Sequence, residues 1–199
     1  LLKLILKFYQ PQKGQIRVGA FPLERIGHEA WRDHVGTVLQ EAFIFDANIE
    51  ENIAVGQARI DAARIAQALE IANLQGFIDE LPLGLKTKIG AQGVGLSQGQ
   101  KQRILIARAV YHQPRLILFD EATNALDASN ERKILSRLDE WFKGKTVVVV
   151  AHRLSTVRFA DQIIVLDKGA IVEVGNHETL TQARGSYYEL VKNQLELGQ

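Results

Sequence analysis

Neither cysteine nor methionine occurs among the 199 residues of this sequence. The absence of cysteine excludes disulfides and thiolate metal sites. An excess of one charge is also lacking: 24 basic and 23 acidic side chains give a formal net charge of +1, which offers no electrostatic reason to expect a nucleic-acid partner. No apolar run approaches the ~20 residues needed to cross a bilayer, so we expect any role at a membrane to come through a partner or through residues outside this sequence.

What the sequence does contain is three apolar runs that end abruptly in polar side chains. They are residues 35–40 (VGTVLQ), 115–121 (RLILFDE) and 146–152 (TVVVVAH). Continuous runs rich in valine, isoleucine and leucine are typical of strands covered on both faces, as in a parallel sheet between helices. A helical pattern over residues 130–142 precedes the third run, and this order of elements predicts an α/β fold with right-handed crossovers.

Four polar side chains stand at the ends of these runs: Gln40, Asp120, Glu121 and His152. A single polar residue at a strand end is most often part of a turn. Ligands of parallel sheets, however, bind beyond the carboxyl ends of the strands, where these four residues would meet. Asp120 is placed to hold Mg²⁺ through water, and the adjacent Glu121 can polarise an attacking water.

Residues 95–109 (GLSQGQKQRILIARA) join a loop of small and amide residues to the start of a helix. Ser97 can cap that helix, and the N–H groups of its first turn can then bind an anion. Lys101, Arg103 and Arg108 are expected on the solvated face of the same helix, with Arg103 placed to contact a partner subunit.

The segment between Gln40 and Ser97 follows a different pattern. Residues 60–77 carry apolar side chains at helical spacing behind Asp61, which predicts one helix. We expect residues 41–111 to form a mostly helical insert in an α/β core built from residues 1–40 and 112–199.

Beyond His152 the pattern predicts a hairpin and then helices. Residues 162–166 and 170–174 are strand-like, and the DKG sequence between them is typical of a hairpin turn. Residues 178–197 predict one or two amphipathic helices with a break at Gly185.

Taken together, the chain resembles the nucleotide-binding domain of ATP-binding cassette (ABC) transporters over essentially its full length. Gln40 matches the Q-loop glutamine of that family, and His152 matches its switch histidine. Three further stretches match the signature motif, the Walker B strand with its catalytic glutamate, and the D-loop: residues 96–100 (LSQGQ), 116–121 (LILFDE) and 124–127 (NALD). The resemblance implies a P-loop NTPase (RecA-like) fold, α/β with a mostly parallel sheet and an inserted α-helical subdomain.

Two stretches favour the exporter type within this family. Residues 43–53 (FIFDANIEENI) look like the segment with which exporter domains meet their transmembrane helices, and residues 175–180 (GNHETL) are typical of exporters. Three departures from the family pattern are Ala91, Gln98 and Asn124, in place of an acidic residue, a glycine and a serine. These departures look like a subgroup of peptide and bacteriocin exporters.

The resemblance implies that two copies sandwich two ATP molecules with Mg²⁺, head to tail, at the cytoplasmic face of the cell's inner membrane, with a transmembrane domain as partner. Two residues would be catalytic: Glu121 and His152. Six would bind the nucleotide, the signature residues acting from the opposite copy: Gln40, Ser97, Gly99, Gln100, Asp120 and Asp127. Of these, Gln40 and Asp120 would also hold the metal, and Asp127 would lie at the seam between copies.

Two other functions remain open. A soluble ABC ATPase acting on DNA or ribosomes would separate Gln40 from the signature by long coiled coils, whereas this chain has a compact insert there. A non-catalytic regulatory module would need neither Glu121 nor His152. The ordered motifs favour the exporter ATPase over both.

The family's phosphate-binding lysine loop precedes a helix similar to residues 1–16, so the resemblance implies that Leu1 falls just beyond that loop. We therefore predict that the 199-residue chain by itself binds ATP weakly and hydrolyses none. A helix N-terminus favours an anion by only about 0.3–1 kcal/mol at an exposed site, while even millimolar affinity requires about −4 kcal/mol. Titration calorimetry measures the affinity, and a micromolar dissociation constant would contradict the prediction.

Overall fold

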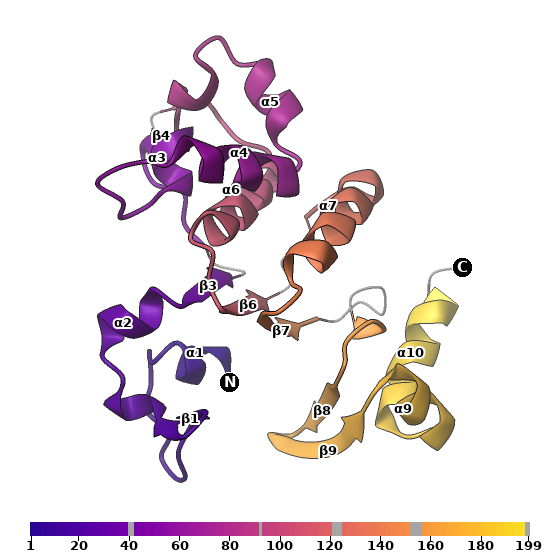
Figure 1. The fold of residues 1–199 in the computed structure, drawn as a ribbon. Helices are drawn as coiled ribbons and strands as arrows, with labels where there is room; N and C mark the ends of the chain where they lie inside the picture. The colour runs from indigo at the N-terminus through magenta and orange to yellow at the C-terminus, as the bar shows by residue number, and fades with distance from the viewer. Residues whose placement is uncertain (40–41, 92, 121–124, 152–156, 198–199) are drawn as a thin grey trace. The chain divides into compact units, whose positions relative to one another are not determined.

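The computed structural model describes residues 1–39, 42–91, 93–120, 125–151 and 157–197. Within it the chain forms two compact units, Leu1–Val148 and Val149–Gln199 (Figure 1). None of the described helices is both long enough and apolar enough to span a membrane.

The three predicted strands form one sheet. They are β3 (Val35–Val38), β6 (Leu116–Asp120) and β7 (Thr146–Val150), in the order β3-β6-β7. The first two pair in parallel, with Val35 opposite Leu116 and Val38 opposite Phe119. The residues Ile117, Leu118 and Phe119 are all buried, as the uninterrupted apolar run of β6 predicts. The predicted parallel α/β core is therefore confirmed.

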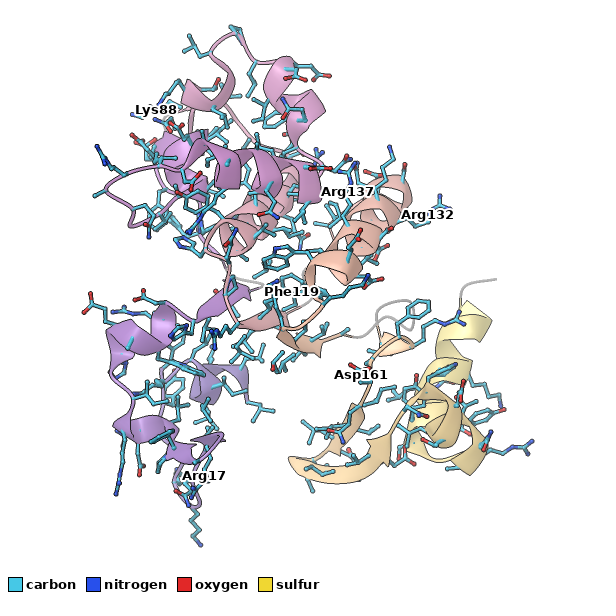
Figure 2. All side chains as sticks on the ribbon, viewed as in Figure 1. Arg17, Lys88, Phe119, Arg132, Arg137 and Asp161 are labelled. Carbon is cyan, nitrogen blue, oxygen red and sulfur yellow. The ribbon has the colours of Figure 1, made fainter. Side chains whose placement is uncertain are left out.

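Two long helices provide much of the core around this sheet, α6 (Gln98–Tyr111) and α7 (Ala128–Trp141). Ile104 and Ile106 of α6, and Ile134 and Leu138 of α7, are fully buried in the same apolar cluster as β6. Figure 2 shows Phe119 of β6 on the side of the strand toward α7, where its ring lies 5.7 Å from that of Phe142.

Three shorter helices belong to the segment between β3 and α6: α3 (Ile49–Ile53), α4 (Ala62–Ile71) and α5 (Gln75–Asp79). Both α3 and α4 pack on α6 (Figure 1). Asp61 caps α4 by accepting from the backbone N–H groups of Ala63 and Arg64 at 2.9 and 3.2 Å. The proposed division of the chain into a helical insert, residues 41–111, and a core stays a prediction.

The prediction of one helix over residues 60–77 is wrong, because the chain turns at Asn73. Asn73 adopts a left-handed conformation with φ 51°. The N–H of Asn73 donates to Glu70 O at 3.0 Å, and that of Leu74 donates to Leu69 O at 2.9 Å. This is the Schellman arrangement that ends a helix, with the apolar Leu74 buried behind it.

The beginning of the chain is less regular than the expected continuing helix. Helix α1 covers only Leu2–Ile5, and the indole N–H of the buried Trp31, on α2 (His28–Arg32), donates to Ile5 O at 2.8 Å. The remaining short elements of this unit are β1 (Arg17–Val18), β2 (Phe21–Pro22), η1 (Leu23–Arg25), β4 (Ala47–Asn48), η2 (Gly84–Lys86) and β5 (Lys88–Ile89).

The second unit confirms the predicted hairpin and helices. Strands β8 (Ile163–Asp167) and β9 (Ala170–Gly175) pair antiparallel, and the turn between them has positive φ at Lys168 (46°) and Gly169 (82°). Such a two-residue turn matches the twist of a hairpin. Helices α9 (His177–Ala183) and α10 (Ser186–Leu197) follow, separated at Arg184 and Gly185.

Gly36 on β3 permits a close approach of the loop after α6, which gives a test of the packing. In Gly36→Ala, the new methyl group would lie 2.5 Å from Pro114 Cγ and 3.3 Å from Ala109 O. A proline ring cannot rotate away, so we expect a loss of about 1–3 kcal/mol in the free energy of unfolding. Thermal unfolding followed by circular dichroism measures it.

The matched control is Gly76→Ala on α5, where the new methyl group meets nothing within 4 Å. Alanine is a better helix former than glycine by up to about 1 kcal/mol, so this variant should keep or raise the melting temperature. Equal melting temperatures for the two variants would contradict the close approach at β3.

Candidate functional site

The carboxyl ends of β3 and β6 lie at one edge of the sheet. Because Val38 pairs with Phe119, the chain leaves β3 beside Asp120, the last residue of β6. Asp120 is half-buried, and within the described ranges no side-chain cation forms an ion pair with it. A partly buried carboxylate without a cationic partner fits Mg²⁺, which takes one or two carboxylates together with water and phosphate oxygens.

Three predicted residues of this edge lie outside the described residues: Gln40, Glu121 and His152. The part of the chain that the structure describes contains no group of three or more His, Cys, Asp or Glu side chains able to hold a metal by themselves. Of the four side chains predicted at this edge, Asp120 is the one within the described residues, and it lies at the end of β6.

The start of α6 is built as the sequence predicts. Ser97 Oγ accepts from the backbone N–H of Gln100 at 3.1 Å, and Gln100 Oε1 accepts from the N–H of Ser97 at 2.8 Å. This reciprocal capping box satisfies two backbone donors. The N–H groups of Gln98 and Gly99 belong to the first helical turn, which has no acceptor within the helix, so they can face an anion.

Residues 125–127 pack directly on this helix start. The N–H of Ala125 donates to Gln102 Oε1 at 3.0 Å. A Cβ atom on Gly99 would lie 3.3 Å from Ala125 O, so the absence of a side chain there lets the two backbones approach. The neighbouring Leu126 is buried, and its Cδ2 would lie 4.0 Å from the same Cβ atom. The described parts of the signature and of the D-loop thus form one structural feature within a single chain.

Asp127 caps α7. Its Oδ1 accepts from the backbone N–H groups of Ser129 and Asn130 at 3.1 and 3.0 Å, and its Oδ2 accepts from Asn130 Nδ2 at 2.5 Å. The hydrogen bonds from Asn130 hold the pKa of the Asp127 carboxyl below its ordinary value. Asp127 is thus ionised at neutral pH, on an exposed surface beside the start of α6.

Asn73, at the turn after α4, joins three helices. Its carbonyl oxygen accepts from Arg103 Nη1 of α6 at 2.8 Å, and its Nδ2 donates to Asn130 Oδ1 of α7 at 2.7 Å. Its Oδ1 accepts from Arg137 Nη1 of α7 at 3.1 Å. Figure 2 shows Arg137 on the side of α7 toward these helices. The contact of Arg103 with Asn73 means that the predicted solvated position of Arg103 is wrong.

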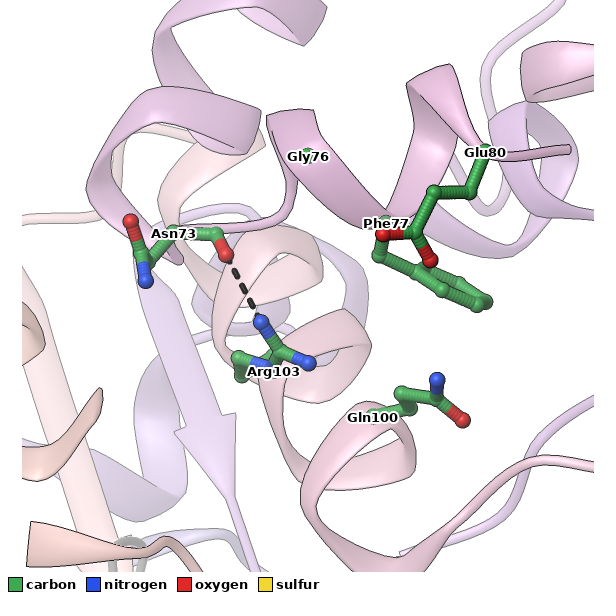
Figure 3. Close-up of a pocket in the computed structure, with 6 residues that line it drawn as sticks. All are labelled: Asn73, Gly76, Phe77, Glu80, Gln100 and Arg103. Atoms are coloured by element: carbon green, nitrogen blue, oxygen red, sulfur yellow. Dashed lines mark hydrogen bonds between the residues drawn. The ribbon is translucent and has the colours of Figure 1, made fainter. Parts of the chain in front are cut away.

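A pocket of about 320 Å³ opens beside Arg103 and is also lined by Gly76, Phe77, Glu80 and Gln100 (Figure 3). Burial lowers the pKa of the Arg103 guanidinium, while the charge of Asp127 opposes that shift. The pocket is therefore lined by the guanidinium of Arg103 and the carboxylate of Glu80. Gln100 also lines it and is part of the capping box, so the pocket adjoins the start of α6.

Arg108, expected on a solvated face, is also placed wrongly by the sequence. Every residue from Ile104 to Tyr111 other than Arg108 is buried. The Arg108 guanidinium reaches the segment that follows β3, where Nη1 donates to Phe43 O at 2.9 Å. It also donates to Asn52 of α3, from Nε to the carbonyl oxygen at 2.8 Å and from Nη2 to Oδ1 at 3.1 Å.

The sequence holds a signal for these missed residues. Arg108 stands within the apolar stretch ILIARAVY, whose side chains are expected to be buried around the helix. The donors of the Arg108 guanidinium therefore need hydrogen-bond acceptors within the protein. Asn52 lies between the charged Glu51 and the apolar Ile53 on the short helix α3 and is fully buried, and a buried amide must be hydrogen-bonded. The identity of the partners could not be predicted, since they lie far away along the chain.

The profile of the family described as "ABC transporter" matches residues 1–124. Among curated relatives, ABC transporter B family member 21 of Arabidopsis thaliana is 46% identical over 98% of this chain and 15% of its own length. The ATP-dependent lipid A-core flippase of Saccharophagus degradans is 44% identical over 98% of this chain and 33% of its own. The toxin RTX-I translocation ATP-binding protein of Actinobacillus pleuropneumoniae is 43% identical, over 98% and 28%. The chain thus spans one third or less of the length of these relatives.

A solved structure described as a bacterial Atm1-family ABC exporter with ATP bound matches with a TM-score of 0.92 and 37% identity. The match covers 97% of this chain and 34% of that one. These similarities agree with the parallel sheet, with Asp120 at its edge and with the capped start of α6. The chain belongs to the ABC transporter family.

Proposed function

We propose that this chain is the ATP-binding and ATP-hydrolysing domain of an exporter, which works as a head-to-tail dimer around two Mg-ATP molecules. The observation that carries the proposal is the similarity of nearly the whole chain, at 37% identity, to an ABC exporter described with ATP bound. Relatives named as a flippase and as a toxin translocation protein support transport out of the cytoplasm. The peptide and bacteriocin subgroup stays a prediction.

The residues at the carboxyl ends of the strands would bind the nucleotide and activate the water that attacks it. Asp120 would hold Mg²⁺ partly through water, together with Gln40. Glu121 would orient and polarise the attacking water, and His152 would donate to the γ-phosphate and position Glu121. The metal, when bound, neutralises charge on the phosphate oxygens. Phosphoryl transfer to water needs alignment and charge neutralisation more than covalent chemistry, so these few groups suffice.

The start of α6 would act on the nucleotide held by the opposite copy. Its capping box fixes Ser97 and Gln100, and leaves the N–H groups of Gln98 and Gly99 directed out of the helix. The contact of Gly99 with Ala125 supports a link between this anion site and Asp127, which would lie at the dimer seam.

The surface after β3 would meet a transmembrane domain. Phe43 and Phe45 expose 67% and 44% of their surface and meet edge to face, with ring centroids 5.5 Å apart. Exposed aromatic pairs of this kind favour a protein partner. The domain would then lie at the cytoplasmic face of the membrane.

The assignment of Glu121 as the base is tested by Glu121→Gln in the polypeptide that the gene encodes. Glutamine keeps the size of the side chain but cannot accept a proton, so we expect ATP binding to persist and turnover to fall by about 100-fold or more. Phosphate release measures turnover, and filter binding of labelled ATP measures affinity. Glu140→Gln, at an exposed position of α7, is the control and should leave both unchanged. Normal turnover in Glu121→Gln would rule out the assignment.

The head-to-tail arrangement is tested by mixing Glu121→Gln with Ser97→Arg. Each variant alone should be inactive, because each removes an essential group from both sites of a dimer. A mixed dimer has one site with both defects and one intact site, so an equal mixture should recover about one quarter of the wild-type activity. If Ser97 acted on the nucleotide of its own copy, both sites would stay defective and the mixture would be as inactive as its components.

A further inference from the structure

Arg108 lies in the last turn of α6, at the end of the helix opposite Ser97. From there, all three nitrogens of its guanidinium donate hydrogen bonds. Their acceptors are the carbonyl oxygens of Phe43 and Asn52 and the side-chain oxygen of Asn52. The Cζ of Arg108 also stands 5.2 Å from the centre of the Phe45 ring. A single side chain of the signature helix thus contacts both ends of the Phe43–Phe45 segment.

Asn52 extends this contact along the segment. Its Oδ1 accepts from the N–H of Phe45 at 2.8 Å, and its Nδ2 donates to the carbonyl oxygens of Phe45 and Asn48 at 3.0 Å each. Asn52 is fully buried, so the amide side of each of these bonds is shielded from water. The backbone from Phe43 to Asn48 is therefore attached to α6 through one arginine and one asparagine.

The chemistry of the contact requires arginine. All three acceptors are neutral, and they receive donors from three nitrogens of one planar group, a geometry that a lysine ammonium cannot reproduce. Burial lowers the pKa of Arg108 to about 10, so the group still carries its charge at neutral pH. The contact therefore holds at any physiological pH.

While the backbone of this segment is fixed to α6, its rings face outward, Phe43 with 67% of its surface exposed. The opposite end of α6, about 16 Å away along the helix axis, carries Ser97. We propose that Arg108 is a positioning residue that makes the Phe43–Phe45 surface and the signature helix move together, so that a displacement of the aromatic surface by the membrane partner reaches Ser97. This inference rests on the proposed function.

The test uses the encoded polypeptide in lipid nanodiscs, with the KM and kcat for MgATP as readouts. Arg108→Lys keeps the charge but loses the three-fold contact, so we expect kcat to fall about fivefold and KM to stay within about twofold. The matched control is Arg137→Lys, which also loses bonds to a backbone carbonyl, Glu70 O, and to an asparagine Oδ1, Asn73. It does not touch Phe43 or Phe45, and its kcat should stay within about twofold of wild type.

A double-variant cycle separates positioning from loss of stability. Phe43→Ala removes an exposed ring but keeps the carbonyl group that Arg108 binds. If the ring acts through Arg108, the fold-loss of kcat in the double variant should be smaller than the product of the fold-losses in Phe43→Ala and Arg108→Lys. Independent effects would instead give that product. Multiplying losses, or an Arg108→Lys variant that matches Arg137→Lys, would overturn the proposal.

A measurement on the wild type covers the case in which Arg108→Lys does not fold. Hydrogen exchange with and without MgATP and orthovanadate should change together at residues 43–48 and at the first turn of α6. A change at one end only would overturn the inference. A wild type that hydrolyses no MgATP would instead overturn the proposed function, which keeps the two failures distinct.

Discussion

The burial of α6 is the constraint on which the rest of the first unit depends. Its residues from Ile104 to Tyr111 are buried around the whole helix, apart from Arg108, and each large apolar side chain among them contributes about 1.5–3 kcal/mol when removed from water. A helix buried in this way must be covered on every side, by β3, α3 and α4. The position of α6 therefore decides where its start, and with it Ser97, is presented.

Polar groups at the junctions around α6 make that position specific. Apolar contacts alone tolerate sliding and rotation, whereas a buried amide or guanidinium loses free energy unless its partner is in place. Asn73 ties the end of α4 to α6 and α7, and Asn52 with Arg108 ties the segment after β3 to the other end of α6. These bonds are few, and they select one arrangement of the helices.

This arrangement gives the proposed function a physical basis. The start of α6, where we propose that an anion binds, lies against Ala125, four residues beyond Glu121, while the far end of the helix holds the exposed aromatic pair. The three proposed tasks of the domain, which are to hold phosphate, to respond to the opposite copy and to contact the membrane partner, therefore meet on a single helix. A rigid helix transmits displacement along its axis better than a loop, because its backbone hydrogen bonds resist bending.

The sequence by itself determined the features that depend on neighbouring residues. The cap at Ser97 and the hairpin turn in the DKG sequence were predicted, and Asp61 was placed near the start of a helix; each of these features involves groups within three residues. The parallel strands were predictable for a related reason, since a short uninterrupted run rich in valine, isoleucine and leucine fits a strand covered on both faces.

Only the tertiary structure decided the rest. The turn at Asn73 interrupts a pattern that is helical in sequence, and the Asn73 side chain finds its partner 57 residues away in Asn130. Arg108 is the clearest case, for its acceptors in Asn52 lie 56 residues earlier. A charged side chain on a helix has the same local propensity whether it meets water or a buried carbonyl, so the outcome is settled by which distant segment packs against it.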